Sequence, residues 1–141
     1  MKTTLKNTLA LVIGLLIGGV ANMALIILGG MVVTPPPGVD VSDMESLKAG
    51  IHLFEFKHFI FPWLAHAVGT LVGAMVAIKL AVSHKYKLAL GVGVFFLAGG
   101  IANVMILPSP LWFNIVDLTL AYIPMGWLAY KLSKKNQTPI N

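Results

Sequence analysis

Four long apolar runs constrain this chain more than any other feature of its sequence. They cover residues 9–33, 56–82, 88–107 and 112–132, and each reaches the roughly 20 residues that an α-helix needs to cross a bilayer. Charged residues make up only 11% of the chain, about half of what soluble domains carry. Because no run alternates as a barrel strand does, we predict an all-α integral membrane protein, a four-transmembrane-helix bundle in one domain of residues 1–141.

The distribution of lysine predicts how the bundle is oriented. Lysines lie before the first run, around the connection between the second and third runs, and at the end of the fourth: Lys2, Lys6, Lys79, Lys85, Lys87, Lys131, Lys134 and Lys135. The first connection instead carries most of the acidic residues. The positive-inside rule therefore predicts a multi-pass protein of a bacterial inner membrane or a plasma membrane, with both termini in the cytoplasm. This asymmetry accounts for the net charge of +5, so no nucleic-acid partner is expected.

A five-residue phrase recurs in the first and third runs. Gly18–Asn22 reads Gly-Gly-Val-Ala-Asn, and Gly99–Asn103 reads Gly-Gly-Ile-Ala-Asn. A weaker likeness joins Phe61–Ala65 in the second run to Ile123–Ala129 in the fourth. Each half crosses the membrane out and back, so the phrase predicts two parallel helical-hairpin repeats related by an axis along the membrane normal. The alternative is chance similarity between apolar segments rich in glycine and alanine.

The two outer connections differ in length. The second turns within residues 108–110, whereas the first covers residues 34–55 and opens with three prolines, which hold it extended. Ser42 and Glu45 then have the spacing of a capping box. An apolar stripe at helical spacing accompanies them: Met44, Leu47, Ile51 and Phe54. We therefore predict a short amphipathic outer helix at about residues 42–54, which lies on the membrane face or covers the bundle.

Small residues recur at every fourth position along two of the runs. The row in the second run is Ala65, Gly69, Gly73 and Ala77. The row in the first run is Ala10, Gly14, Gly18 and Asn22. Such rows let helix backbones approach closely in a membrane, where no hydrophobic effect drives helices together. We expect both rows to face protein, either inside the bundle or across a homodimer contact formed by the row of the second run.

Two prolines interrupt the apolar runs, Pro62 in the second and Pro124 in the fourth. Each removes one backbone hydrogen bond and frees the carbonyl four residues earlier, at His58 and Leu120. We expect kinks at both places, with a freed carbonyl available to a polar cavity. The alternative is that the helices accept these prolines by local adjustment, as transmembrane helices often do.

The polar residues of the runs gather in the predicted outer half of the bundle. At 1.5 Å per residue, Asn22 and Asn103 lie past the midplane of the bilayer. His58 lies at the outer mouth of the second helix with His66 about 12–15 Å deeper, and Asp117 is about one and a half turns into the fourth. Ionisable groups at such depth are costly, so each is a functional hypothesis by default. We predict that all five of these residues bind a ligand.

Each of these residues also has a purely structural interpretation. The two asparagines fit hydrogen bonds between helices, worth about 0.6–2 kcal/mol each. Asp117 fits an ion pair with Lys57 or a place near a helix N-terminus. His66 fits a neutral ring that a neighbouring carbonyl satisfies. The sequence assigns no catalytic residue.

The first connection also has a weak metal-site pattern, because His52, Glu55 and His58 are spaced as ligands on one helical face. A third ligand from another helix would be needed, and the second Glu-x-x-His of a di-iron bundle is missing. We therefore predict no metal and no cofactor, and keep Glu55 with His58 as an alternative. The chain has no cysteine, which excludes disulfides and thiol chemistry.

These patterns favour a protein that binds or moves a small solute, an ion or a lipid headgroup through a polar pocket in its outer half. Interrupted helices at matching places in two halves mark such sites in transporters. In this interpretation His66 is the proton-sensitive group, Asp117 is its counter-charge, and the two asparagines are neutral ligands. Two alternatives stay open: a membrane-embedded enzyme that acts on a lipid or quinone with Glu55 and His58, and a scaffold or accessory subunit.

Overall fold

We describe residues 2–135 of the computed structural model, in which every regular element is helical. In chain order the elements are α1 (Lys2–Val32), α2 (Met44–Gly50), the 3₁₀ helix η1 (Ile51–Leu53), α3 (Phe56–Leu80), α4 (Lys85–Ile106), α5 (Leu111–Leu120) and α6 (Ile123–Lys135). The long helices begin and end within a few residues of the predicted runs, except that α1 begins earlier and the fourth run is divided in two.

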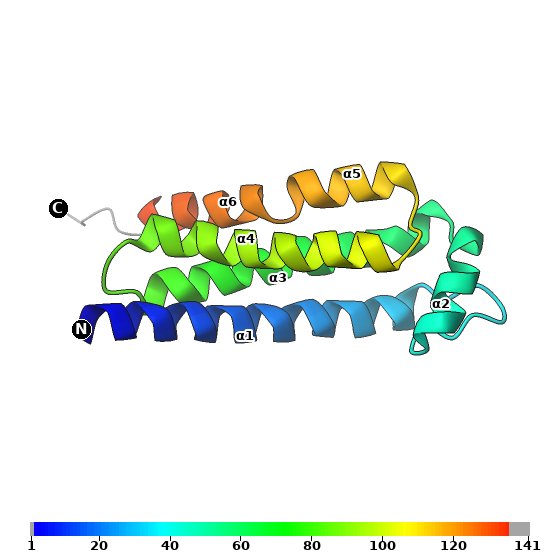
Figure 1. Ribbon diagram of the computed structural model, residues 1–141, viewed down its shortest axis with the longest axis horizontal. Coiled ribbons are helices and arrows are strands. Elements are labelled where there is room, and N and C mark those ends of the chain that lie inside the picture. The colour runs from blue at the N-terminus through cyan, green and yellow to red at the C-terminus, as the bar shows by residue number, and fades with distance from the viewer. Residues whose placement is uncertain (1, 136–141) are drawn as a thin grey trace.

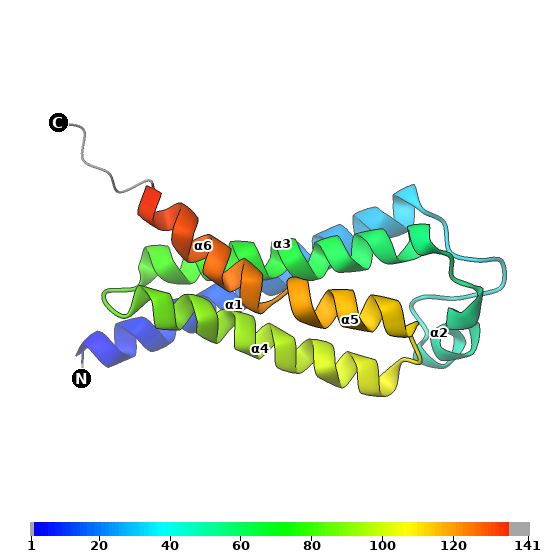
Figure 2. The same ribbon diagram turned by 90° about the horizontal axis from the view of Figure 1, so that it is seen from above.

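The long helical segments run antiparallel along one axis and form an elongated bundle (Figure 1). α1 lies on one side, α5 and α6 lie on the opposite side, and α3 and α4 lie between them (Figures 1 and 2). The start of α1, the turn between α3 and α4 and the end of α6 share one end, which carries every lysine except Lys48 and Lys57. We call it the lysine-rich end. The opposite end carries α2 and is called the α2 end.

The helical segments have the character of membrane spans. α1, α3, α4 and the α5–α6 segment at residues 111–135 are each long and apolar enough to cross a membrane. Large apolar side chains face outward: Leu16, Val20 and Met31 of α1 are 64–75% exposed. Burial inside α1 is confined to small residues, namely Ala10, Gly14, Gly18 and Gly29. Surface of this kind is unfavourable in water and is typical of helices that contact lipid.

The rows of small residues on α1 and α3 pack against each other. A Cβ built on Gly73 would lie 2.7 Å from the carbonyl oxygen of Gly14, and one built on Gly69 would lie 2.9 Å from that of Gly18. All four members of the row on α3 are buried in the bundle: Ala65, Gly69, Gly73 and Ala77. A homodimer through this row is not compatible with the packing, because α1 covers it. A dimer would need another face.

The two copies of the repeated phrase use different glycines. On α1, Gly18 contacts α3, while a Cβ on Gly19 would meet no atom within 4 Å. On α4 the order is reversed, since Gly100 contacts Tyr122 and Gly99 contacts nothing. The buried position therefore shifts by one residue between the copies. Equivalent packing of the two phrases is absent, and the parallel repeat stays a prediction.

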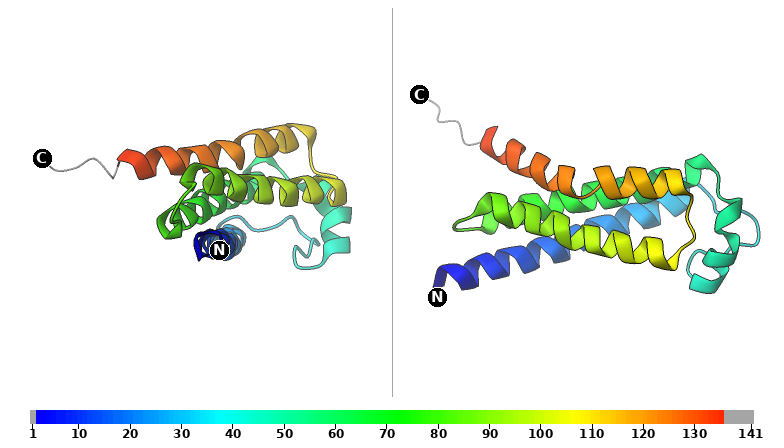
Figure 3. Two further views of the ribbon diagram at one scale, coloured as in Figure 1. Left: turned by 60° about the vertical axis from the view of Figure 1, so that its left-hand side comes forward. Right: turned by 45° about the horizontal axis from the view of Figure 1, so that its top comes forward.

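The helix predicted at residues 112–132 is two helices that meet at an angle (Figures 2 and 3). α5 ends at Leu120 and α6 begins at Ile123, with Pro124 in its first turn. Pro124 has no N–H to bond to the carbonyl of Leu120, and proline is well tolerated in a first turn, so the helix ends and restarts here. α3, by contrast, continues through Pro62.

The first connection forms a short helix, as predicted, but a different residue caps it. Asp43 is the N-cap of α2, and its carboxylate accepts a hydrogen bond from the N–H of Ser46 at 2.8 Å. The predicted capping residue, Ser42, instead donates its hydroxyl to Asp40 at 2.6 Å. Hydrogen bonds from the side chain and backbone of Ser42 lower the pKa of Asp40. The cap therefore lies one residue later than the capping-box pattern indicated.

Candidate functional site

Three polar side chains meet between α3 and the α5–α6 break. Nδ1 of His66 lies 2.8 Å from Oδ1 of Asp117, and the hydroxyl of Tyr122 donates to Oδ2 of the same carboxylate at 2.8 Å. The hydroxyl also lies 3.0 Å from Nδ1 of His66, which closes a ring of contacts. Asp117 and Tyr122 are only 2% and 1% exposed. We call these three residues the His–Asp–Tyr cluster.

The helix break is what brings Tyr122 to Asp117. On an uninterrupted helix, residues five positions apart point about 140° away from each other. Because α5 ends at Leu120, the chain turns between the two residues and the hydroxyl returns to the carboxylate. α4 makes room for this turn with glycine: a Cβ on Gly100 would lie 2.5 Å from the hydroxyl, and one on Gly93 would lie 3.1 Å from the Tyr122 carbonyl.

Neighbouring groups fix the orientation of His66. Its ring stacks beside that of Tyr122, with centroids 5.7 Å apart and an interplanar angle of 28°. Thr70, which is fully buried, donates its hydroxyl to the backbone carbonyl of His66 at 2.8 Å. With Nδ1 bonded to Asp117 as well, the imidazole has one defined placement relative to α3.

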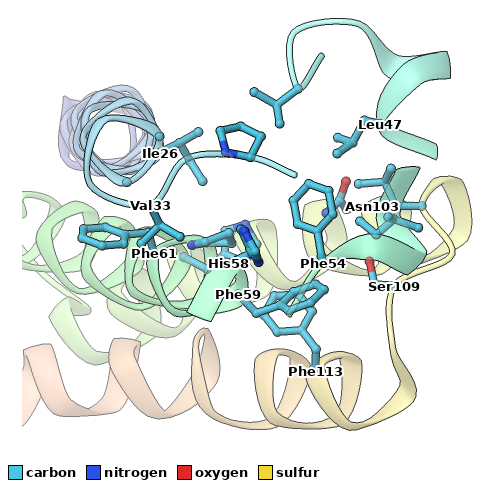
Figure 4. A pocket seen from close by; sticks show the side chains of 18 residues that line it. Ile26, Val33, Leu47, Phe54, His58, Phe59, Phe61, Asn103, Ser109 and Phe113 are labelled. Atoms are coloured by element: carbon cyan, nitrogen blue, oxygen red, sulfur yellow. The ribbon is translucent and has the colours of Figure 1, made fainter. Parts of the chain in front are cut away.

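A cavity of about 250 Å³ lies beside the cluster at the α2 end (Figure 4). The end of α1, the first connection, η1, α3, the end of α4 and the start of α5 all contribute to its wall. The lining is mostly apolar and rich in aromatic rings: Phe54, Phe59, Phe61 and Phe113. Because Val41, Leu47 and Ile51 of the first connection also line it, this connection covers the bundle.

Three polar side chains in the wall have hydrogen-bonding atoms left over. His66 lines the cavity, whereas Asp117 and Tyr122, which bind its Nδ1, do not. Nδ1 of His66 is engaged by both of them, whereas its Nε2 has no hydrogen-bond partner among residues 2–135. The side chains of Asn103 and Ser109 also line the cavity (Figure 4) and have no partner in the same part of the chain.

His58 lines the cavity too, but both of its ring nitrogens are engaged. Nδ1 accepts a hydrogen bond from the N–H of Glu55 at 2.9 Å, as part of a capping box that begins α3. Nε2 lies 3.2 Å from the carbonyl oxygen of Thr34, to which it donates. His58 thus ties the start of the first connection to its end. It has no nitrogen to spare for a ligand.

Glu55 is also explained by local structure. Its carboxylate lies 2.9 Å from Nζ of Lys57, and the side chain is largely exposed. The hydrogen bond and the positive charge of Lys57 lower the pKa of Glu55. Among residues 2–135, no group of three histidine, aspartate or glutamate side chains lies close enough to hold a metal ion. The arrangement therefore gives no support to the alternative metal site at Glu55 and His58.

Asn22 does not reach the cavity. It lies on the face of α1 that packs on α3, where its Cβ would be 2.8 Å from a Cβ built on Gly69. Its Oδ1 is buried and has no hydrogen-bond partner within the described residues. Of the five predicted ligand residues, the structure brings His66 and Asp117 into contact and places His58, His66 and Asn103 in the cavity wall. Asn22 stands apart.

Comparisons of the chain with protein families, with curated proteins and with solved structures each found no match.

The arrangement is suited to recognition and proton exchange. A histidine held at Nδ1 by a carboxylate presents Nε2 in a fixed direction, which is how proteins position a hydrogen-bond donor, a base or a metal ligand. The hydroxyl of Thr70, one turn after His66, is bonded to the backbone and is not free to act as a nucleophile. Sequence reasoning missed Tyr122 and Thr70. The one signal that pointed toward Tyr122 was the interruption expected at Pro124.

Proposed function

We propose that the protein binds a small, largely apolar molecule in the cavity at the α2 end, with a polar atom of that molecule placed at His66. One observation carries the proposal. His66 lines an apolar cavity, its Nδ1 is hydrogen-bonded to Asp117 at 2.8 Å, and its Nε2 has no partner among the described residues. A polar atom beside apolar walls is costly unless something pairs with it.

The size and lining of the cavity favour a ring-sized guest. An engineered apolar cavity of about 150 Å³ in another protein holds benzene, so about 250 Å³ accommodates a substituted ring or two fused rings. No lysine, aspartate or glutamate lines the cavity. Burying a charged ligand without an opposite charge is strongly unfavourable. A hydrated ion and a charged lipid headgroup, both included in the prediction from sequence, are therefore less well supported than an uncharged molecule.

Binding is better supported than passage through the bundle. Toward the lysine-rich end the helices pack around small residues without exposed surface, among them Ala77, Ala89 and Ala129. A Cβ on Gly126 would lie 2.7 Å from the carbonyl oxygen of Ala89, so α4 and α6 are in close backbone contact there. A path across the membrane would require these helices to separate.

The proposed membrane orientation follows from the lysines. With the lysine-rich end in the cytoplasm, the cavity lies in the outer half of the membrane, under the first connection. An apolar guest is then able to arrive from the outer leaflet. The enzyme alternative at Glu55 and His58 is not proposed further, because both residues are engaged in beginning α3.

Native mass spectrometry of the protein in mild detergent tests this function. We expect a small molecule to stay bound at one copy per chain, and Leu107→Trp, which fills the cavity from its wall, to remove it. Ile106→Trp is the matched control, because this neighbour is 50% exposed and does not line the cavity. Wild-type protein without any adduct, or an adduct that survives Leu107→Trp, would contradict the proposal.

A further inference from the structure

We propose that the ligand of this cavity is an uncharged carbonyl compound of the quinone type, and that Nε2–H of His66 donates a hydrogen bond to its carbonyl oxygen. The inference rests on the proposed function and adds the chemical class of the ligand. It follows from counting the protons that the His–Asp–Tyr cluster holds, from the remaining polar atoms in the wall, and from the size of the cavity.

The proton count of the cluster determines whether Nε2 donates or accepts. Suppose that His66 and Asp117 share one proton between Nδ1 and the carboxylate, and that a second proton is bound to Nε2. The pair is then neutral overall. The shared proton then lies either on Nδ1, as an ion pair, or on the carboxyl group. Nε2 carries a hydrogen in both cases. Because Oδ2 accepts from Tyr122 and so carries no proton itself, a bare Nε2 requires a pair with a net charge of −1.

The surroundings favour the neutral pair. Asp117 has two partners among the described residues, His66 and the uncharged hydroxyl of Tyr122, and no lysine reaches it. The other titratable side chain in the cavity wall is His58, whose ring nitrogens contact the N–H of Glu55 and the carbonyl oxygen of Thr34. α1 and α4 contribute no titratable side chain to the wall. A net negative charge would thus be buried without compensation, which is far costlier than burying a neutral pair.

A donor that projects into an apolar cavity selects a ligand with an acceptor. Asn103 of α4 adds a side-chain amide with two N–H groups to the cavity wall, and Ser109 adds a hydroxyl (Figure 4). A quinone carries two carbonyl oxygens on one flat apolar ring, which suits an aromatic cavity whose wall holds more than one hydrogen-bond donor. An aliphatic acid or an amine would bring a charge that this wall does not compensate.

The first experiment compares two probes of nearly the same shape. Menadione is a fused-ring quinone, and methylnaphthalene is the corresponding hydrocarbon without carbonyl groups. Binding of each to wild-type protein in detergent is measured by calorimetry, and the absence of cysteine removes covalent capture of the quinone by thiols. We expect menadione to bind about tenfold more tightly, as one or two hydrogen bonds in an apolar site allow. Equal binding of both probes would overturn the inference.

Substitution of the donor supplies a second arm. His66→Phe is expected to weaken menadione binding and to leave only the part of the preference that Asn103 and Ser109 supply, while methylnaphthalene binds as before. His66→Gln retains an N–H donor and should recover part of the preference. His52→Phe is the control, because His52 is exposed and lies outside the cavity wall. A quinone preference that persists unchanged in His66→Phe would contradict the assigned donor.

A third measurement detects the proton on Nε2 of His66 directly and is made on the wild-type protein, so it does not require a stable variant. In protein labelled with ¹⁵N-histidine, Nε2 of His66 should give the resonance of a protonated ring nitrogen, and that resonance should shift when menadione is added. A resonance typical of an unprotonated nitrogen would refute the donor. The two proposals fail differently: if neither probe binds, the proposed function falls, whereas equal binding of both removes only the ligand class.

Discussion

The hydroxyl of Tyr122 occupies the space that a side chain at position 100 would need. A Cβ on Gly100 would lie 2.5 Å from the hydroxyl oxygen and 2.7 Å from the ring carbon that bears it. The neighbouring Gly99 faces open space. One glycine of the repeated phrase is therefore part of the candidate site, because it permits the hydrogen bond between Tyr122 and Asp117.

The first prediction follows from that pair of glycines. Gly100→Ala should displace the Tyr122 ring and break its hydrogen bond to Asp117, which costs about 1.5–3 kcal/mol for a charged acceptor. The gain in helix propensity offsets up to about 1 kcal/mol, so a net loss of about 0.5–3 kcal/mol is expected. Gly99→Ala should instead be neutral or stabilising. Unfolding in mixed detergent measures both, and equal stability of the two variants would show that the ring does not depend on Gly100.

A second prediction concerns the pairing of His66 with Asp117. His66→Leu leaves the carboxylate buried with only Tyr122 as a partner, and loss of one member of a buried pair typically costs about 3–5 kcal/mol. Replacing both residues by leucine removes the stranded charge, so the double variant should be more stable than His66→Leu alone. Unfolding free energies of the two single variants and the double variant form the test cycle. If the single losses simply add, the contact contributes nothing to stability.

The contact between α1 and α3 gives a third prediction. A Cβ on Gly18 would lie 2.6 Å from the backbone oxygen of Gly69, which has no freedom to move aside. Gly18→Ala should therefore separate the two helices and destabilise the protein by at least about 1 kcal/mol. Gly19→Ala should be neutral or stabilising, since nothing lies within 4 Å of that position. Thermal unfolding of both variants in the same detergent decides the matter, and a Gly18→Ala protein as stable as wild type would contradict the close packing.

The fourth prediction concerns how the cavity is covered. His58 links the carbonyl of Thr34 to the N–H of Glu55, the two ends of the first connection. His58→Phe keeps an aromatic ring in the wall but removes both hydrogen bonds, so hydrogen exchange at residues 38–54 should become faster. His52→Phe, which removes an exposed histidine of η1, should leave the exchange unchanged. Identical exchange in the two variants would mean that apolar packing alone holds the connection in place.

The four helical segments long and apolar enough to cross a membrane were predictable from the sequence, because each contains about twenty apolar residues in a row. Close helix contact along both rows of small residues was predictable as well, since such rows let helix backbones approach closely. The helix against which each row packs was not predictable. The cap at Asp43 was not predictable either, because the sequence offers several residues that are able to cap the same turn.

The candidate site was only half predictable for a physical reason. His66 and Asp117 were predicted as site residues because ionisable groups are rare in the middle of long apolar segments. Tyr122 does not, because tyrosine is ordinary in a membrane helix and its position five residues after Asp117 points away on any continuous helix. Its role depends on a break between Leu120 and Ile123. Pro124 predicted where the helix would be interrupted, but not how the chain would turn there. Asn22 was predicted as a ligand residue from its depth along the helix, but it lies on the face of α1 that packs on α3 and not in the cavity wall.

The last prediction concerns the membrane orientation on which the outward placement of the cavity depends. The chain has no cysteine, so single-cysteine variants report on one position at a time. Ser42→Cys, in the exposed first connection at the α2 end, should react with a membrane-impermeant maleimide in intact cells. Ser133→Cys, near the end of α6 at the lysine-rich end, should react only after the cells are opened. The reverse labelling pattern would mean that the protein has the opposite orientation, with the cavity in the inner half of the membrane. Because the contacts of His66 do not depend on orientation, the ligand class would stand, but the guest would then come from the cytoplasmic leaflet.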